Sequence, residues 1–175
     1  VEVIVPKKIR CCGSLNHHLG KEDDAHQDFR NNINTWYDEH QKGNLDAILS
    51  NTSGCGTTMK DYGFIFKDDE EMKKKAKVIS ELTKDVSEYL SESIKLNFKA
   101  KEKKYKIAYH SACSMQHGQK VHDQPVSLLN KTENEIMEIP EGHIFCGSAG
   151  TYNILQTEIA KELLSKKVKN IEGLN

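Results

Sequence analysis

The sequence has few of the features that mark a nucleic-acid-binding or membrane-spanning protein. Its 25 Lys and Arg residues are balanced by 26 Asp and Glu residues, so no excess of positive charge is available to bind a phosphate backbone. Only Arg10 and Arg30 are arginines, and lysines suit solvated helix faces better than bidentate recognition of phosphate. No apolar run has the length of a membrane span, and the first residues do not form a secretory signal. We therefore expect no nucleic-acid partner and no transmembrane segment.

Several catalytic and metal-binding motifs are also missing. The segment Gly54-Cys55-Gly56-Thr57-Thr58-Met59 lacks the third glycine of a dinucleotide loop, and there is no phosphate loop or Gly-x-Ser-x-Gly elbow. No Cys-x-x-Cys pair occurs, which makes zinc a weaker alternative, and five cysteines in 175 residues do not form a secreted disulfide scaffold. Cys113 beside His110 could be a nucleophile with a base, but no clear orienting partner accompanies them.

What the sequence does contain is one motif that occurs twice. Cys11-Cys12-Gly13-Ser14 aligns with Phe145-Cys146-Gly147-Ser148, which places Cys12 and Cys146 134 residues apart. At the same offset Val5-Pro6 aligns with Ile139-Pro140, so each copy is predicted to be a short strand, a proline, a few polar residues and Cys-Gly-Ser. The chemistry differs at one position, where Cys11 is opposite Phe145. We interpret the chain as a duplicated cysteine-bearing unit.

The remaining cysteines, Cys55 and Cys113, each follow an apolar run. Moved by the same 134 residues, Cys55 falls after Asn175 and Cys113 falls before Val1. Each unit is therefore expected to lack one cysteine, and the chain is expected to be an excised fragment.

Hydrophobic periodicity predicts strands that alternate with helices. The predicted strands are Val1–Val5, Leu45–Ser50, Lys106–Tyr109 and Ile136–Ile139, and the predicted helices are Asp24–Lys42, Asp68–Leu90, Asp123–Leu129 and Thr151–Ile171. The polar stretch from Ser91 to Lys104 predicts a boundary between domains 1–95 and 105–175. This order predicts an α/β fold of duplicated Rossmann-like lobes, with parallel strands, flanking helices and a pseudo-twofold relation between the lobes.

The cysteines all follow predicted strands, and loops from parallel strands converge at one edge of a sheet. Neighbouring thiols such as Cys11 and Cys12 rarely both serve packing, whereas an iron–sulfur cluster can use both as ligands. Gly13 would let the backbone approach such a cluster. A single cysteine is more often a small buried hydrophobe, but the repeated pattern favours cluster ligation. The candidate ligands are Cys11, Cys12, Cys55, Cys113 and Cys146.

Four segments resemble the iron–sulfur subunit family of glycolate oxidase, and the similarity spans almost the whole chain. The resemblance extends more loosely to lactate-utilisation iron–sulfur proteins, the anaerobic glycerol-3-phosphate dehydrogenase C subunit and the cysteine-rich subunit of heterodisulfide reductase. The segments are Cys11-Cys12-Gly13-Ser14-Leu15-Asn16-His17-His18-Leu19, Ser53-Gly54-Cys55-Gly56-Thr57-Thr58-Met59-Lys60-Asp61-Tyr62-Gly63, Gln116-His117-Gly118-Gln119-Lys120 and Cys146-Gly147-Ser148-Ala149-Gly150-Thr151-Tyr152.

The resemblance implies an electron-transfer subunit of an oxidoreductase, with no substrate-oxidising site on this chain. It implies a 4Fe–4S type cluster, an FAD-containing partner subunit that oxidises a 2-hydroxy acid, and a downstream acceptor such as a quinone. It also implies a cytoplasmic location, or a peripheral one at the inner face of the cell membrane. The alternative is a metal-free structural or docking module derived from such a subunit.

By the same resemblance, Cys11, Cys12 and Cys55 match ligands of the first repeat, and Cys113 and Cys146 match two of the second. Phe145 departs from the family pattern, because a phenyl ring cannot bind iron where the family usually has cysteine. Ala112 also replaces a common proline. The second cluster is therefore expected to be weakly held or absent.

Histidines flank the cysteines, and they are interpreted as hydrogen-bonding groups around a cluster rather than as ligands. They are His17, His18, His110 and His117. The alternative is a metal site formed by His110-x-x-Cys113-x-x-x-His117.

Overall fold

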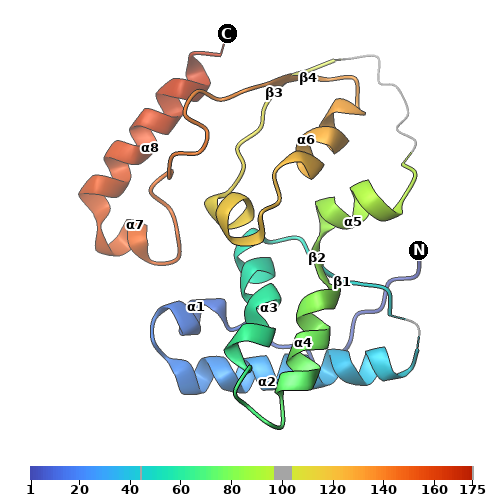
Figure 1. The fold of residues 1–175 in the computed structure, drawn as a ribbon. Coiled ribbons are helices and arrows are strands. Elements are labelled where there is room, and N and C mark those ends of the chain that lie inside the picture. The colour runs from blue at the N-terminus through green and yellow to red at the C-terminus, as the bar shows by residue number, and fades with distance from the viewer. Residues whose placement is uncertain (44, 97–103, 175) are drawn as a thin grey trace. The chain divides into compact units, whose positions relative to one another are not determined.

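The computed structural model describes residues 1–43, 45–96 and 104–174. The chain divides into two compact units, Val1–Tyr89 (unit 1) and Leu90–Asn175 (unit 2), each considered by itself below (Figure 1). Both combine helices with a short pair of parallel strands, so the predicted α/β class is confirmed. None of the described helices has both the length and the hydrophobicity that a membrane crossing requires.

Unit 1 is a helical layer built around two parallel strands, in which β1 pairs with β2 from Ile48↔Thr83 to Ser50↔Asp85. Helices α3 and α4 connect these strands, and α2 runs across both helices (Figure 1). The elements are α1 (Ser14–His18), α2 (Glu22–Gln41), β1 (Ile48–Ser50), α3 (Ser53–Ile65), α4 (Lys73–Leu82) and β2 (Thr83–Asp85), followed by α5 (Val86–Ser93), which continues into unit 2.

The core of unit 1 forms where one face of α2 meets the apolar faces of α3 and α4. Phe29 is fully buried, and its ring centroid lies 4.9 Å from that of Tyr62 and 6.3 Å from that of Phe66. Burial of such side chains is worth about 1.5–3 kcal/mol each. The buried cluster comprises Ala25, Phe29, Ile33, Ile48, Met59, Tyr62, Phe66, Met72, Ala76 and Ile79.

Unit 2 also has two parallel strands, with β3 paired to β4 from Lys106↔Glu135 to Ala108↔Met137. Its buried apolar residues are Val121, Ile139 and Ala160, a much smaller set than in unit 1. The elements are β3 (Lys106–Ala108), the π-helix η1 (Ser114–Gln119), α6 (Asp123–Asn130), β4 (Glu135–Met137), α7 (Tyr152–Leu155) and α8 (Thr157–Glu172).

Two predicted elements are wrong. Val1–Val5 forms no strand, and its valines are 77–88% exposed, because no described segment pairs with it. The single helix predicted over Asp68–Leu90 is interrupted by β2. Thr83 takes an extended conformation, and its hydroxyl donates to the carbonyl of Ile79, so the chain leaves the helix and pairs with β1.

The other predicted helices and strands are present with shifted ends, except that the last helix is divided into α7 and α8 at Gln156. Helices α1 and α3 were not predicted. The glycines in Ser53-Gly54-Cys55-Gly56 indicated a loop, yet this segment begins α3, because its apolar side chains Met59 and Tyr62 pack into the core. Tertiary burial therefore outweighs the weak helix propensity of glycine.

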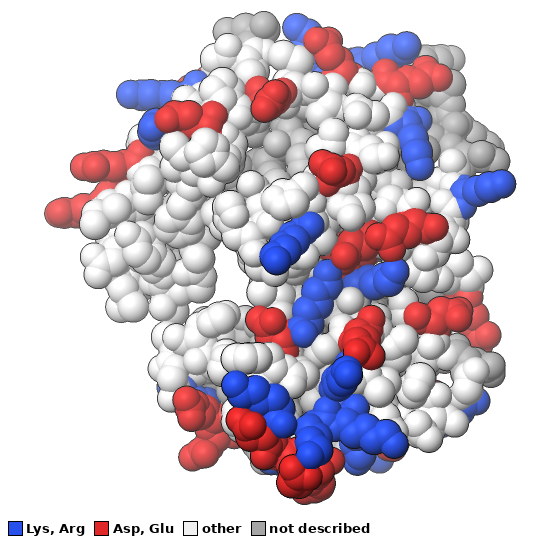
Figure 2. Space-filling model, viewed as in Figure 1, with Lys and Arg blue, Asp and Glu red and all other residues white. Residues whose placement is uncertain are grey.

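Lysines and acidic residues are interspersed on the face of the molecule in Figure 2. Many lie in short ion pairs within one unit, such as Lys73 with Glu70 at 2.6 Å and Lys166 with Glu141 at 2.9 Å. Exposed pairs of this kind contribute about 0–1 kcal/mol each. Much of the positive charge on this surface is thus matched locally by acidic neighbours.

Candidate metal centre

Two of the predicted ligand residues lie in contact in unit 1. The Cys12 thiol donates a hydrogen bond to the Cys55 Sγ at 3.0 Å, although the two residues are 43 positions apart in the sequence. Cys12 lies in the loop before α1, whereas Cys55 lies in the first turn of α3, directly after β1. Both side chains are partly buried, and both pack against the core. The fold of unit 1 therefore brings these two thiols together.

A glycine turn directs the cysteine loop toward the core. Gly13 has φ +76°, and a Cβ atom there would lie 2.4 Å from Phe29 Cε1 and 3.2 Å from the carbonyl oxygen of Ala25. No side chain fits in that space, and the left-handed conformation is itself costly for other residues. The predicted role of Gly13, close approach of the backbone, is thus one that the structure requires of it toward α2.

Two buried side chains hold the backbone of the cysteine loop. Asn32 of α2, which is fully buried, donates through Nδ2 to the carbonyl of Cys11 at 2.8 Å and accepts from the N–H of Arg10 at 2.8 Å. Tyr62 of α3, also fully buried, donates its hydroxyl to the carbonyl of Cys12 at 2.9 Å. Because buried polar groups that lose a partner cost about 1–3 kcal/mol, these bonds fix the loop in one conformation.

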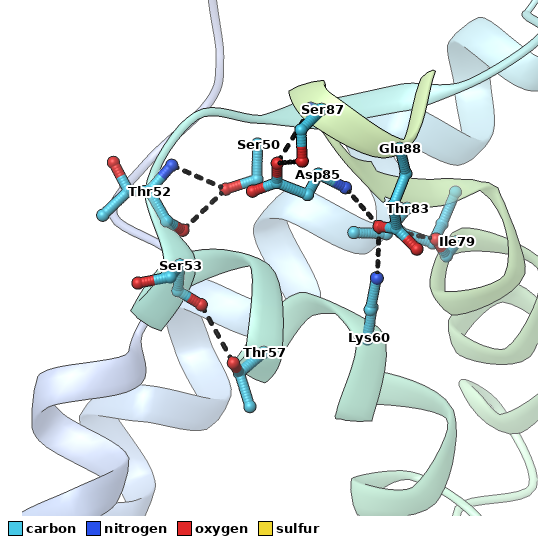
Figure 3. A network of polar contacts seen from close by, with 10 residues as sticks. All are labelled: Ser50, Thr52, Ser53, Thr57, Lys60, Ile79, Thr83, Asp85, Ser87 and Glu88. Atoms are coloured by element: carbon cyan, nitrogen blue, oxygen red, sulfur yellow. Dashed lines mark hydrogen bonds and ion pairs between the residues drawn. The ribbon is translucent and has the colours of Figure 1, made fainter. Parts of the chain in front are cut away.

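The helix that carries Cys55 is anchored by a polar network at the carboxyl ends of β1 and β2 (Figure 3). Glu88 accepts from the backbone N–H of Asp85 at 2.7 Å and from Lys60 Nζ of α3 at 2.5 Å. Asp85, 2% exposed, accepts from the N–H of Ser87 at 2.8 Å, so Asp85 and Glu88 form a capping box for α5. Lys60 thereby ties α3 to this cap.

Burial keeps the thiol of Cys12 protonated. It raises the pKa of Cys12 to about 12, and the hydrogen bond to Cys55 acts in the same direction, while a bond from the backbone N–H of Ser14 opposes it. Burial likewise raises the pKa of Tyr62. A catalytic thiolate needs the opposite shift, so Cys12 is poorly suited to be a nucleophile. Metal binding would require Cys12 to lose its proton.

Cys11 adjoins the pair, but its side chain is exposed. Within residues 1–43, 45–96 and 104–174, no three His, Cys, Asp or Glu side chains are grouped closely enough to hold a metal ion as they stand. The donor set nevertheless suits an iron–sulfur cluster in its chemistry, since three thiols belong to one loop and one facing helix turn. To complete such a set, Cys11 must rotate toward Cys12 and Cys55.

The second pair of predicted ligands is less closely assembled. Cys113 precedes η1 and Cys146 precedes Gly147, both half-buried, and no hydrogen bond between them is seen in the described part of unit 2. Phe145 packs edge-to-face on Tyr152, with ring centroids 5.3 Å apart, and lines a small cavity with Leu163. The position opposite Cys11 is therefore occupied by a packed aromatic ring.

The histidines differ in their surroundings. His17 packs edge-on against Phe29 at 5.6 Å, and its Nδ1 is buried with no hydrogen-bond partner within the described residues. His110 has a buried Nε2 that also lacks a partner there, and burial, with the charge of Lys167 second, lowers its pKa. His117 is exposed. The grouping of His110, Cys113 and His117 as a metal site is not assembled in the described structure.

Sequence reasoning missed the residues that hold the cysteine loop. Asn32 and Tyr62 lie far from the cysteines in sequence, and neither belongs to a recognisable ligand motif. One signal was available for Asn32, because it is a polar residue next to Ile33 on the apolar face of α2. A polar residue on a buried helix face needs a hydrogen-bond partner nearby.

Comparison with known proteins agrees with this centre. The chain is 33% identical to the glycolate oxidase iron–sulfur subunit of Escherichia coli over 99% of its own length and 42% of that protein. It is 27% identical to a probable glycolate oxidase iron–sulfur subunit of Bacillus subtilis, of which it covers 38%, and 25% identical to lactate utilization protein A of a Geobacillus strain, of which it covers 71%.

The chain thus spans less than half the length of the two glycolate oxidase relatives, and the resemblance seen in the sequence is confirmed. No solved structure matches it significantly. The cysteine-rich domain family named CCG matches residues 1–60 and 107–175, the two stretches that carry all five cysteines. The chain therefore belongs to the CCG cysteine-rich domain family.

Proposed function

We propose that the chain is an iron–sulfur electron-transfer part of an oxidoreductase that oxidises a 2-hydroxy acid, of the glycolate oxidase type. The observation that carries the proposal is the contact of Cys12 with Cys55 at 3.0 Å, next to Cys11, in a loop fixed by buried hydrogen bonds. Relatives named as glycolate oxidase iron–sulfur subunits support it. The chain would relay electrons, and substrate oxidation would take place on a partner.

The first cluster would be held by Cys11, Cys12 and Cys55, and the second by Cys113 and Cys146. A cluster of the 4Fe–4S type would supply one-electron transfer when bound. The chain's own residues hold the ligands in place: Gly13 allows the tight turn, and Asn32 and Tyr62 hold the loop carbonyls. Three and two thiols fall short of the usual four, so further ligands would have to be supplied from elsewhere.

The two cysteine repeats would be related lobes, 1–95 and 105–175, of Rossmann-like type and pseudo-twofold symmetry. The supporting observation is a turn that both units share. Gly147 has φ +89°, and its Cβ atom would lie 2.4 Å from the carbonyl oxygen of Ala160, the fourth residue of α8. Gly13 faces the carbonyl of Ala25, which is likewise the fourth residue of its helix, α2.

The partner would be an FAD-containing subunit that oxidises the 2-hydroxy acid, and the electrons would pass on to a quinone or another acceptor. The complex would be cytoplasmic or peripheral at the inner face of the membrane. These assignments rest on the names of the relatives.

The decisive experiment is metal analysis of the full-length protein purified without oxygen. We expect iron and sulfide in roughly equal amounts and a broad visible absorption that a reductant bleaches. Cys12→Ser should remove the iron of the first site while the helical content stays the same. Cys146→Ser is the matched control, because it should leave the first site intact. Unchanged iron content and spectrum in Cys12→Ser would refute the assignment.

Phe145 favours a second candidate for the second lobe, a docking module that no longer binds metal. If the second site is a weakened cluster site, Phe145→Cys should raise the iron content per chain. If it is a docking module, the iron content should stay constant and stability should fall, because the edge-to-face contact with Tyr152 is lost.

A further inference from the structure

Helix α8 carries an exposed apolar stripe with no partner among the described residues. Leu164, Val168 and Ile171 are 53%, 40% and 37% exposed, and their spacing of four and three residues places them on one helix face. We call these three residues the α8 stripe. Its neighbours Ala160 and Lys167 are buried, so α8 packs against unit 2 along an adjacent line and leaves the stripe uncovered.

The internal repeat identifies the counterpart of this stripe. When the long helices α2 and α8 are aligned from their first residues, Ala25 corresponds to Ala160, as the shared glycine contact requires. In the same register the α8 stripe corresponds to Phe29, Ile33 and Trp36 of α2. Phe29 and Ile33 are fully buried, and Trp36 packs against the same core. The same helix face is thus covered in unit 1 and bare in unit 2.

The element that covers this face in unit 1 is chiefly α3. Phe29 packs on Tyr62 of α3, and Met59 of α3 belongs to the same buried cluster. Since α3 begins with Cys55 in its first turn, the packing that covers α2 is also the packing that brings the second thiol to Cys12.

We propose that the α8 stripe is the docking face for a helix of the α3 kind: an amphipathic helix with a cysteine in its first turn, from another stretch of the same polypeptide. In unit 1 the corresponding helix follows α2 in the same polypeptide. A second copy of α3 is not available, because its apolar side chains are buried in unit 1. The glycolate oxidase relatives are more than twice as long as the matched part, so they contain room for such a helix.

The docked helix would do for Cys146 what α3 does for Cys12. Its first-turn cysteine would lie beside the Cys146 turn and add a thiol to a site that has Phe145 in place of one. This inference rests on the duplication proposed above, and it deepens the proposed function by supplying a ligand source for the second site.

The test measures how accessible the stripe is in the full-length protein. Val168→Cys places a thiol on the stripe, and Ser165→Cys places one at a nearby exposed position off the stripe. Maleimide labelling of each is followed by peptide mass spectrometry, which separates the new thiol from the native cysteines. Docking predicts that Val168→Cys reacts at least about tenfold more slowly than Ser165→Cys, since labelling requires local opening. Equal rates would overturn the proposal.

A photo-crosslinking residue in place of Val168 identifies the occupant. The expected product is an intramolecular crosslink to a peptide outside residues 1–175 that contains a cysteine. A crosslinked dimer, or a crosslink to residues 1–89, would overturn the proposal. Iron analysis of the same samples separates the two hypotheses: a protected stripe without iron refutes only the cluster, and an exposed stripe with iron refutes only the docking helix.

Discussion

Gly13 and Gly147 make the same left-handed turn in the two units, but the surroundings of the two turns differ. Behind Gly13 lies Phe29, fully buried between α2 and α3, whereas the corresponding Leu164 of α8 is 53% exposed. Both turns are closed against an alanine carbonyl in the first turns of a long helix. The turn is therefore a local property of Cys-Gly and the helix that follows, while the packing behind it depends on a second helix.

The same difference extends to the cysteines. Where α3 is present, a second thiol lies 3.0 Å from Cys12 and a tyrosine holds the loop. Where no such helix covers α8, Cys146 has no thiol in hydrogen-bond contact among the described residues. The comparison teaches that the glycine turn places one ligand, and that a helix like α3 completes the site.

The largest expected effect is on the two core positions that correspond. Phe29→Ala should destabilise unit 1 by about 3–5 kcal/mol, because it empties a fully buried site, whereas Leu164→Ala should cost less than about 1 kcal/mol in this 175-residue chain. Urea unfolding followed by the fluorescence of Trp36, the single tryptophan, measures the first. Hydrogen exchange in α8 measures the second. Equal losses would show that the two helix faces are not differently covered.

The next effect concerns the glycine turn. Gly13→Ala combines an unfavourable φ with a collision with Phe29, and it should cost about 2–4 kcal/mol. Gly20→Ala is the matched control, since Gly20 has φ +73° but nothing lies within 4 Å of its added Cβ atom. It should cost only about 1 kcal/mol, as conformational strain alone does. If thermal unfolding gave equal costs, close approach to α2 would not be what Gly13 provides.

A smaller effect is expected from the hydroxyl that holds the cysteine loop. Tyr62→Phe keeps the ring in the core and removes the bond to the Cys12 carbonyl, so it should cost about 1–3 kcal/mol, the penalty for a buried group left without its partner. Iron should also be lost faster to a chelator. Tyr152→Phe in unit 2 is the control and should leave the first site unchanged. A chelation rate unaffected by Tyr62→Phe would remove the loop from the account of the metal centre.

The smallest effect is a dependence of stability on pH. The backbone N–H of Met72, and then Arg30, lower the pKa of Asp69 below its ordinary value of 3.8. The stabilisation is present above that ordinary value and is lost as pH falls through the lowered pKa. Asp69→Asn keeps an acceptor oxygen for Met72, so unfolding midpoints between about pH 5 and pH 2 should become less pH-dependent. An unchanged profile would show that Asp69 contributes nothing to it.

Unit 2 provides the counterpart of this experiment. Hydrogen bonds from Lys166 and Asn170 lower the pKa of Glu141. Glu141→Gln should therefore reduce the acid sensitivity of hydrogen exchange in α8 and leave the Trp36 signal of unit 1 unaltered. A change in the unit 1 signal would contradict the separation of the two units.

Much of the fold followed from local patterns in the sequence. Helical periodicity predicted α2, and acids in its first turn favour its start. By contrast, Val1–Val5 has the alternation of a strand but forms none, because strands exist only in pairs and no described segment lies beside it. Helix α3 was missed for the opposite reason, since burial of Met59 and Tyr62 overrides its glycines. Propensity fails where tertiary contacts supply or withhold a partner.

By itself the sequence determined the repeat, the positive-φ glycines after Cys12 and Cys146, and the family to which the chain belongs. These properties depend on residues next to one another or on identity at fixed spacing. Only the tertiary structure decided that Cys12 meets Cys55, that Asn32 and Tyr62 hold the loop, and that α2 is covered while α8 is bare. The physical reason is that each of these depends on how separate helices pack, and burial is a property of neighbours that the local sequence does not contain.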